Sequence, residues 1–254
     1  MEQEKKSFFD LMSPKQTFIV GGVAGFLVLC AIGFFILLGL MFKGGLNFGG
    51  ADSAAALDFE APKKFSACLD EGQKATKVKT DAQLGASLGV SGTPATFANG
   101  YLISGALPYE MVKQVIDALL VGKEPNQMFD FMKDEKGNLV KRANMPELQD
   151  AIWVGDKDAK ITLVEFADFE CPYCSKFDSS VMQVLANYGD KVRYTFRHFP
   201  LSFHANAQKA GEAFECAKEQ GKTWEMHDKL FRLSDTKTMS VENYKRAASE
   251  LGLK

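Results

Sequence analysis

The 254-residue sequence has little cysteine, little histidine and almost no excess of charge of either sign. Five cysteines in a chain of this length do not make a disulfide scaffold, so cysteine chemistry has to depend on their spacing. His198, His204 and His227 show no paired metal-ligand spacing and there is no second Cys-x-x-Cys motif, so we expect no metal site and no cofactor. The 30 basic and 32 acidic residues nearly cancel, which predicts no nucleic-acid partner.

Charge is missing altogether from one long stretch near the N-terminus. No charged residue occurs from Gln16 to Phe42, and the run is apolar nearly throughout. A helix needs about 20 apolar residues to cross a bilayer, whereas the apolar core of a cleaved signal peptide has about 7–15. The stretch therefore predicts an uncleaved transmembrane helix. Three lysines precede it and only Lys43 closely follows, which favours a cytoplasmic N-terminus and an extracytoplasmic body (periplasmic or at the cell surface), where disulfides persist.

One pair of cysteines has the spacing of redox chemistry. Cys171 and Cys174 follow a strand-like apolar run, Ile161–Phe169, and open a predicted helix in which Pro172 suits the first position. Unpaired backbone N–H groups and the helix dipole would favour a thiolate on Cys171, and Cys174 could then resolve a mixed disulfide. The alternatives are a zinc knuckle, which normally needs four ligands, and an inert disulfide, for which an exposed helix start is a poor place.

These stretches resemble a known family. DsbA-type thiol–disulfide oxidoreductases, which are thioredoxin-fold enzymes with an inserted helical subdomain, have an active-site region similar to VEFADFECPYCSKF. The strand and first inserted helices that follow in that family resemble RHFPLSFHANAQKAGEAFECAKEQGKTWEMHDKLF. The family's last inserted helix, cis-proline loop and final hairpin–helix resemble FSACLDEG and LGVSGTPATFANGYLISGALPYE. The resemblance covers roughly residues 62–121 and 150–254.

The resemblance implies which residues bind the substrate. Thr93-Pro94 should be a cis peptide packed against the two motif cysteines, with the backbone before the proline pairing with an extended substrate. Pro172 and Tyr173, between the cysteines, should contact the substrate as well. Glu165 should be a buried carboxylate that exchanges protons with Cys174, with burial raising its pKa; the alternative is an exposed glutamate at the sheet edge.

Four other residues also receive an assignment from the sequence. Asp168 and Glu170 directly precede the motif, and we expect both to face solvent. Cys68 and Cys216 fall in helices of the same subdomain of the family, so they are candidates for a structural disulfide, with two buried free thiols as the alternative.

The order of the matching segments departs from the family, because its C-terminal third precedes its N-terminal two-thirds. Joining Lys254 to Pro62 would restore the family order, so the sequence resembles a circular permutation. A domain-swapped dimer, in which the two parts come from different chains, is the rival interpretation. In chain order we predict a cytoplasmic N-terminus (1–16), a transmembrane anchor (17–42), a flexible tether (43–61), the C-terminal part of the fold (62–121), a permutation linker (122–149) and the N-terminal part with the redox motif (150–254).

The sequence thus predicts a circularly permuted α/β thioredoxin-like fold with an inserted helical subdomain, behind an N-terminal transmembrane helix. The predicted function is a membrane-anchored extracytoplasmic thiol–disulfide oxidoreductase that introduces disulfides into exported proteins. Its predicted partners are reduced or unfolded exported proteins and a membrane redox partner. A disulfide reductase or isomerase, and a non-catalytic peptide-binding chaperone, remain alternatives.

Overall fold

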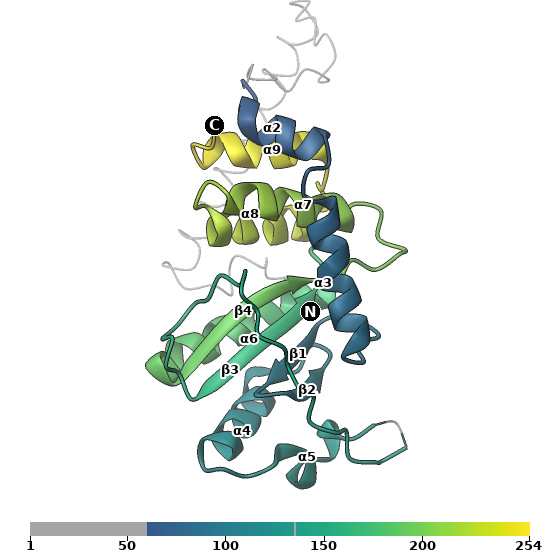
Figure 1. The fold of residues 1–254 in the computed structure, drawn as a ribbon, viewed down its shortest axis with the longest axis vertical. Helices are drawn as coiled ribbons and strands as arrows, with labels where there is room; N and C mark the ends of the chain where they lie inside the picture. The colour runs from purple at the N-terminus through teal and green to yellow at the C-terminus, as the bar shows by residue number, and fades with distance from the viewer. Residues whose placement is uncertain (1–59, 135) are drawn as a thin grey trace, which may run out of the picture. The chain divides into compact units, whose positions relative to one another are not determined.

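Four strands form a mixed sheet in the order β2-β1-β3-β4 in the computed structural model, which describes residues 60–134 and 136–254 (Figure 1). Strands β1 (Ala95–Ala98) and β2 (Tyr101–Ser104) are antiparallel, and β1 is also antiparallel to β3 (Ile161–Ala167). Strand β3 is parallel to β4 (Val192–His198). Both faces of β3 are covered, which is why its sequence is apolar almost without alternation.

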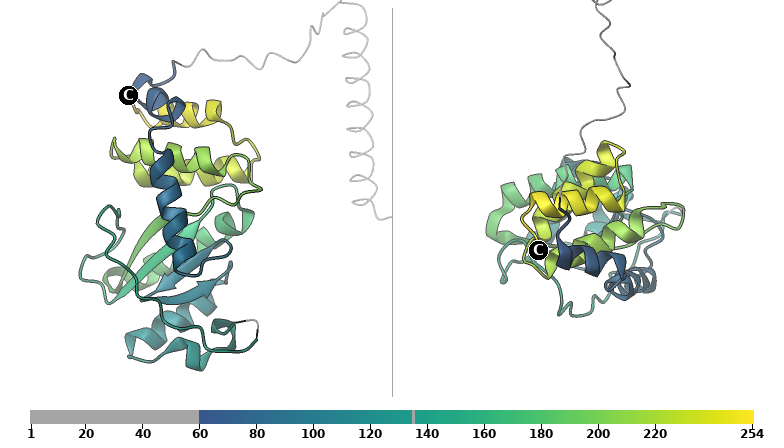
Figure 2. Two further views of the ribbon diagram at one scale, coloured as in Figure 1. Left: turned by 45° about the vertical axis from the view of Figure 1, so that its right-hand side comes forward. Right: turned by 90° about the horizontal axis from the view of Figure 1, so that it is seen from above.

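Helices surround this sheet. Figures 1 and 2 show that α2, α7, α8 and α9 lie together beyond one end of the sheet, as a helical subdomain. Helix α6 contacts both α4 and β4, while α3 contacts β4 and α7. The bounds are α2 (Lys63–Asp70), α3 (Ala75–Ser87), α4 (Tyr109–Leu120), α5 (Pro125–Met128), α6 (Pro172–Tyr188), α7 (Ala207–Lys218), α8 (Thr223–Asp235) and α9 (Val241–Glu250), with short 3-10 helices η2 (Asp130–Met132) and η3 (Gly189–Lys191).

Two apolar clusters cover the two faces of the sheet. Alternate residues of β3 belong to different clusters because successive side chains of a strand point to opposite faces. Leu163 packs in the larger cluster with residues of α4 and α6 and of the helical subdomain. Val164 and Phe166 pack in the smaller cluster, against α3 and the segment that precedes β3. A Cβ on Gly85 of α3 would lie 2.9 Å from the Phe166 ring, so glycine permits this close approach.

The β1–β2 hairpin turns at Asn99-Gly100, as its sequence predicts. Both residues have positive φ, 48° and 89°, which is the conformation of a tight two-residue hairpin turn. The Asn99 side chain also binds the adjoining strand: its Oδ1 accepts from the Thr162 N–H at 2.7 Å, and its Nδ2 donates to the Lys160 carbonyl. This turn therefore fixes the hairpin to the start of β3.

The connection from α4 to β3 follows the sheet closely. The Ala143 N–H donates to the Gly100 carbonyl at 2.8 Å, and Trp153 packs against the smaller apolar cluster. Val154 then exchanges two backbone hydrogen bonds with Tyr194, at the outer edge of β4. The predicted linker, residues 122–149, thus contacts the β1–β2 hairpin, and the residues that follow it contact β4.

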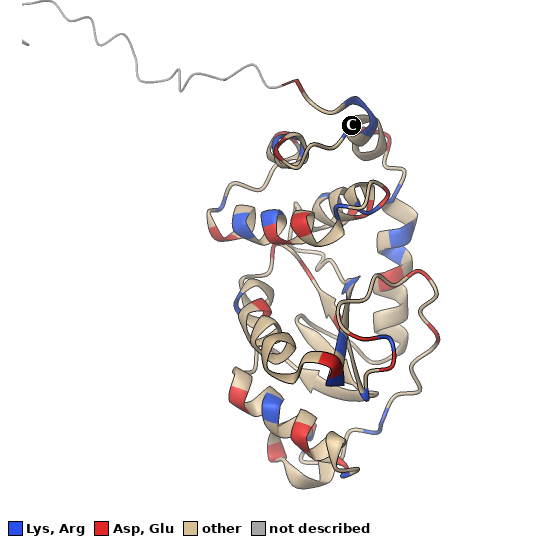
Figure 3. Cartoon of the chain, turned by 90° about the vertical axis from the view of Figure 1, so that its left-hand side faces the viewer, with Lys and Arg blue, Asp and Glu red and all other residues tan. Residues whose placement is uncertain are grey.

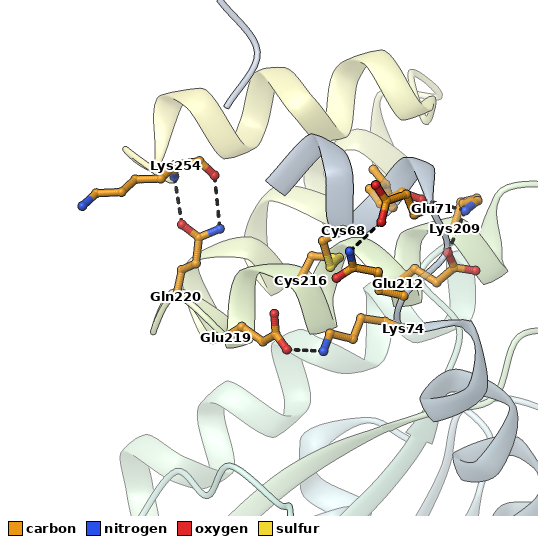
Figure 4. Close-up of a disulfide and its surroundings, with 11 residues drawn as sticks. Cys68, Glu71, Lys74, Lys209, Glu212, Cys216, Glu219, Gln220 and Lys254 are labelled. Atoms are coloured by element: carbon orange, nitrogen blue, oxygen red, sulfur yellow. Dashed lines mark hydrogen bonds and ion pairs between the residues drawn. A yellow bond between two sulfur atoms is a disulfide. The ribbon is translucent and has the colours of Figure 1, made fainter. Parts of the chain in front are cut away.

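The two segments that resemble the family pack together within one chain. The Phe65 N–H of α2 donates to the Lys254 carbonyl at 2.7 Å, so the end of the printed sequence lies beside the start of α2. Cys68 of α2 and Cys216 of α7 form a disulfide, which is the first of the two alternatives considered for these residues. Figure 4 shows this disulfide with the nearby Lys74–Glu219 ion pair.

Charged residues of both signs are interspersed over the helices on the face shown in Figure 3. The predicted transmembrane helix, residues 17–42, lies outside the described residues. Within residues 60–134 and 136–254, the structure contains no helix that is both long and apolar enough to cross a membrane.

Candidate functional site

The Cys-x-x-Cys motif lies at the N-terminus of α6, directly after β3. Cys171 is the N-cap residue and Pro172 the first residue of the helix. The two thiols are free in this structure. A hydrogen bond from the Cys174 thiol, opposed by burial and assisted by backbone N–H groups of the first turn, lowers the pKa of Cys171 to about 5. At neutral pH, Cys171 is therefore a thiolate.

A second wall of the site comes from the loop before β1. The Thr93-Pro94 peptide is cis, and the Thr93 carbonyl lies 3.6 Å from the Cys171 Sγ. Residues 78 positions apart in the chain are thus neighbours here. Strand β1 brings them together, because it continues from Pro94 and pairs with β3, which leads to Cys171.

Behind the reactive sulfur lies a buried acid–base pair. Cys174 is 0% exposed, and burial raises the pKa of its thiol far above the ordinary value. Glu165 is 2% exposed, so it is not a glutamate at an exposed edge. Its Oε2 accepts a 2.8 Å hydrogen bond from the Tyr194 hydroxyl. Burial, only partly opposed by this hydrogen bond, raises the pKa of Glu165 to about 8, which suits proton transfer near neutral pH.

The acidic residues before the motif do not both face solvent. The expectation is wrong for Asp168, which is buried and accepts hydrogen bonds from the Glu170 and Leu201 N–H groups and from His204 Nδ1. The partly buried Glu170 accepts two hydrogen bonds from Asn206. The loop after β4 folds back over the residues before Cys171. The contacting residues are 33 and 36 positions apart, so no local sequence pattern indicated this contact.

The residues between the two cysteines border the exposed side of the site. The Tyr173 side chain is 65% exposed. Pro172 lines a cavity of about 400 Å³ at the boundary with the helical subdomain. The other residues lining this cavity are Glu170, Asn206, Ser234, Asp235, Lys237 and Met239. This cavity therefore lies between the motif and the helical subdomain.

One buried cluster in the described residues has the composition of a metal site. Ligand-type atoms of Asp81, His198 and Glu215 all lie within 4.8 Å of one another. However, Asp81 pairs with Arg197 at 3.1 Å and with Lys77 at 2.5 Å, and Glu215 lies 3.1 Å from His198 Nε2. Because cations already accompany the carboxylates, we interpret the cluster as an ion-pair network that joins α3 to β4 and α7.

Comparisons with curated proteins match only a part of larger transporters. The Na(+)/H(+) antiporter NhaA 3 of Salinispora tropica is 50% identical over 82 residues, and the NhaA antiporter of Herminiimonas arsenicoxydans is 38% identical over 99 residues. These matches cover 32% and 39% of this chain. The chain spans only 12% and 15% of the length of these two relatives.

Comparisons with solved structures include alpha-DsbA1 of Wolbachia pipientis, at 26% identity and a TM-score of 0.38 over 43% of this chain and 58% of that one. A periplasmic thioredoxin-like protein of Salmonella enterica serovar Typhimurium gives 26% identity and a TM-score of 0.35 over 41% and 59% of the two chains.

The family comparison covers most of the sequence. The family model Thioredoxin_4, described as Thioredoxin, matches residues 34–118 and 147–252. The two matched segments contain the cis-proline loop and the Cys-x-x-Cys motif, respectively. With these two segments matched and a mixed α/β fold around a four-stranded sheet, the chain belongs to the thioredoxin family.

Proposed function

We propose that this protein is a thiol–disulfide oxidoreductase of the DsbA type that donates a disulfide to exported proteins. The observation that carries the proposal is the contrast between its two thiols. The pKa of Cys171 is lowered to about 5, while burial raises the pKa of Cys174, its neighbour three residues later. Such a contrast separates an attacking or leaving thiolate from a resolving thiol.

The geometry supports the following reaction. A substrate thiolate attacks Cys171 Sγ of the Cys171–Cys174 disulfide, forming a mixed disulfide and releasing Cys174 as a thiolate. This thiolate takes a proton from Glu165, whose pKa of about 8 keeps its carboxyl protonated at neutral pH. A second substrate thiolate attacks the substrate sulfur of the mixed disulfide, so that the substrate is oxidised and Cys171 leaves as a thiolate.

The low pKa of Cys171 supports the oxidising direction. A thiolate that is stable at neutral pH is a good leaving group, and it stabilises the reduced form of the protein over its disulfide form. The disulfide is then transferred readily to a substrate. A membrane redox partner, of the class that accepts two electrons from a dithiol, would reoxidise Cys171 and Cys174.

Two finer proposals concern a circular permutation of the fold and a membrane anchor at the N-terminus. The contact between Phe65 and Lys254 supports a circular permutation, because it places residue 254 where a chain in the family order would continue into α2. The uncharged stretch before residue 43 supports a single-pass membrane anchor with its N-terminus in the cytoplasm and the catalytic body outside it.

The test is transfer of the disulfide from the oxidised full-length protein to reduced, unfolded ribonuclease A. We expect one ribonuclease disulfide to form for each Cys171–Cys174 disulfide that becomes reduced. Cys171→Ser should abolish transfer, whereas Cys68→Ser with Cys216→Ser should retain it. Equal transfer by Cys171→Ser would rule out the proposed function, and transfer only in the opposite direction would indicate a reductase.

A further inference from the structure

We propose that Asp178 is the port through which protons pass between the buried Glu165–Cys174 pair and solvent, with His227 positioning its carboxylate. This inference rests on the proposed exchange reaction and concerns a step that the redox motif cannot perform alone. Neither Asp178 nor His227 is part of the Cys-x-x-Cys motif or of the cis-proline loop.

A port is required because the inner groups have no access to solvent. Cys174 is 0% exposed, and Glu165 and its hydrogen-bond partner Tyr194 are each 2% exposed. Each cycle nevertheless moves protons across this barrier. When Cys174 leaves as a thiolate it takes the proton of Glu165. Because the pKa of Glu165 is about 8, the remaining carboxylate takes up a proton from water at neutral pH, and Cys174 has to release its own proton to water when the motif is reoxidised.

Asp178 is well placed to provide this proton. It follows Cys174 by four residues in α6, so the two side chains lie on the same face of the helix, one turn apart. Its negative charge acts on both inner groups, since it raises the pKa of Glu165 and of Tyr194. The Asp178 side chain is 26% exposed and thus reaches water. Burial raises its own pKa, so it holds a proton more readily than an ordinary aspartate.

His227 of α8 lies behind this carboxylate. Its ring is buried against the aromatic rings of Phe169, Phe196, Trp224 and Phe231. The Nδ1 atom lies 3.1 Å from Oδ1 of Asp228, which is exposed at the surface. The Nε2 atom makes no hydrogen bond to any residue that the structure describes, and it lies 3.9 Å from Asp178 Oδ1. A movement of less than about 1 Å would turn this approach into a hydrogen bond, as happens in sites that tighten during reaction.

Two carboxylates near Asp178 have the same sign of charge as its own carboxylate. Asp228 and Asp235 of α8 both raise its pKa, whereas His227 lowers it. On the inner side lie Glu165 of β3, Tyr194 of β4 and Cys174 of α6. A proton that reaches Asp178 from water therefore lies between the carboxylates of α8 on the solvent side and the buried Glu165 on the inner side. From Asp178 it can pass either to Glu165 or back to water.

The experiment measures the reaction of the oxidised full-length protein with excess reduced glutathione between pH 5 and 9, by rapid acid quenching and alkylation. Asp178→Asn should slow net reduction of the disulfide by about 10²-fold near neutral pH and change its pH profile, because positioned proton-transfer groups contribute about 10²-fold or more. His227→Gln should give a smaller loss in the same pH range. Asp178→Glu should restore the rate, and acetate should accelerate Asp178→Ala but not the unmodified protein.

Asp190→Asn is the matched control, because it removes an exposed aspartate beyond the C-terminal end of α6 without removing the port; its rate should stay within about twofold of the unmodified protein. Alkylation of Cys171 alone should keep its pH profile in all variants, which shows that the site is folded. Unchanged rates and pH profiles in Asp178→Asn and Asp178→Ala would overturn the inference. If the unmodified protein failed to react at all, the proposed function would fail instead.

Discussion

The Cys68–Cys216 disulfide joins the two segments of the fold, so its removal gives a quantitative test of how they are held together. The bonded residues are 148 positions apart, and closing a loop of that length in the unfolded chain is worth about 5 kcal/mol by the chain-entropy relation. Both side chains are buried, so Cys68→Ala with Cys216→Ala also loses packing. We expect the free energy of unfolding to fall by about 5 kcal/mol.

The fall in the free energy of unfolding when the disulfide is removed should depend on the order of the two segments in the chain. In a rearranged chain, in which residue 254 is joined directly to residue 62, the bonded cysteines would be only about 45 positions apart. The same relation then predicts a contribution about 1 kcal/mol smaller than in the natural order. The rearranged chain should fold, because Lys254 already contacts the first turn of α2.

The assay is equilibrium unfolding in guanidinium chloride, with both chain orders measured with and without the two alanine substitutions. The Cys171–Cys174 redox equilibrium serves as a control and should not change. A loss below about 1 kcal/mol in the natural order would refute the reasoning that this disulfide holds the segments together. A larger loss in the rearranged chain than in the natural one would contradict the loop-entropy argument.

Three further predictions concern the site. Alkylation of Cys171 by iodoacetamide should follow a thiolate with a midpoint near pH 5; a midpoint near 8.5 would contradict the lowered pKa. Because the pKa of Glu165 is raised to about 8, stability should fall as pH rises from about 4.5 to 8, and Glu165→Gln should remove that fall in urea unfolding. Asp168→Ala should increase hydrogen exchange at the Leu201 N–H, a change that should not occur if this hydrogen bond is absent.

Local signals made parts of this protein predictable. The strand before Cys171, the proline at the first position of α6 and the Asn99-Gly100 turn are all encoded within a few residues. The placement of Thr93 beside Cys171 came from resemblance to a family, since residues 78 apart give no local sign of contact.

Long-range contacts explain what the sequence did not reveal. Asp168 reads as a solvent-facing acid because it lies between a strand and a helix start, yet the loop containing Leu201 and His204 covers it. In the same way, nothing local indicated that Ala143 binds the hairpin turn and that Val154 pairs with the edge of β4. These arrangements depend on which distant backbone groups need hydrogen-bond partners after the sheet has formed.

The central claim is that Cys171 and Cys174 form a disulfide-donating pair, and its most direct test is the reduction potential of the full-length protein at equilibrium with glutathione at pH 7. The stabilised Cys171 thiolate predicts a potential well above that of thioredoxin, which is about −270 mV. A potential at or below the thioredoxin value would contradict the account.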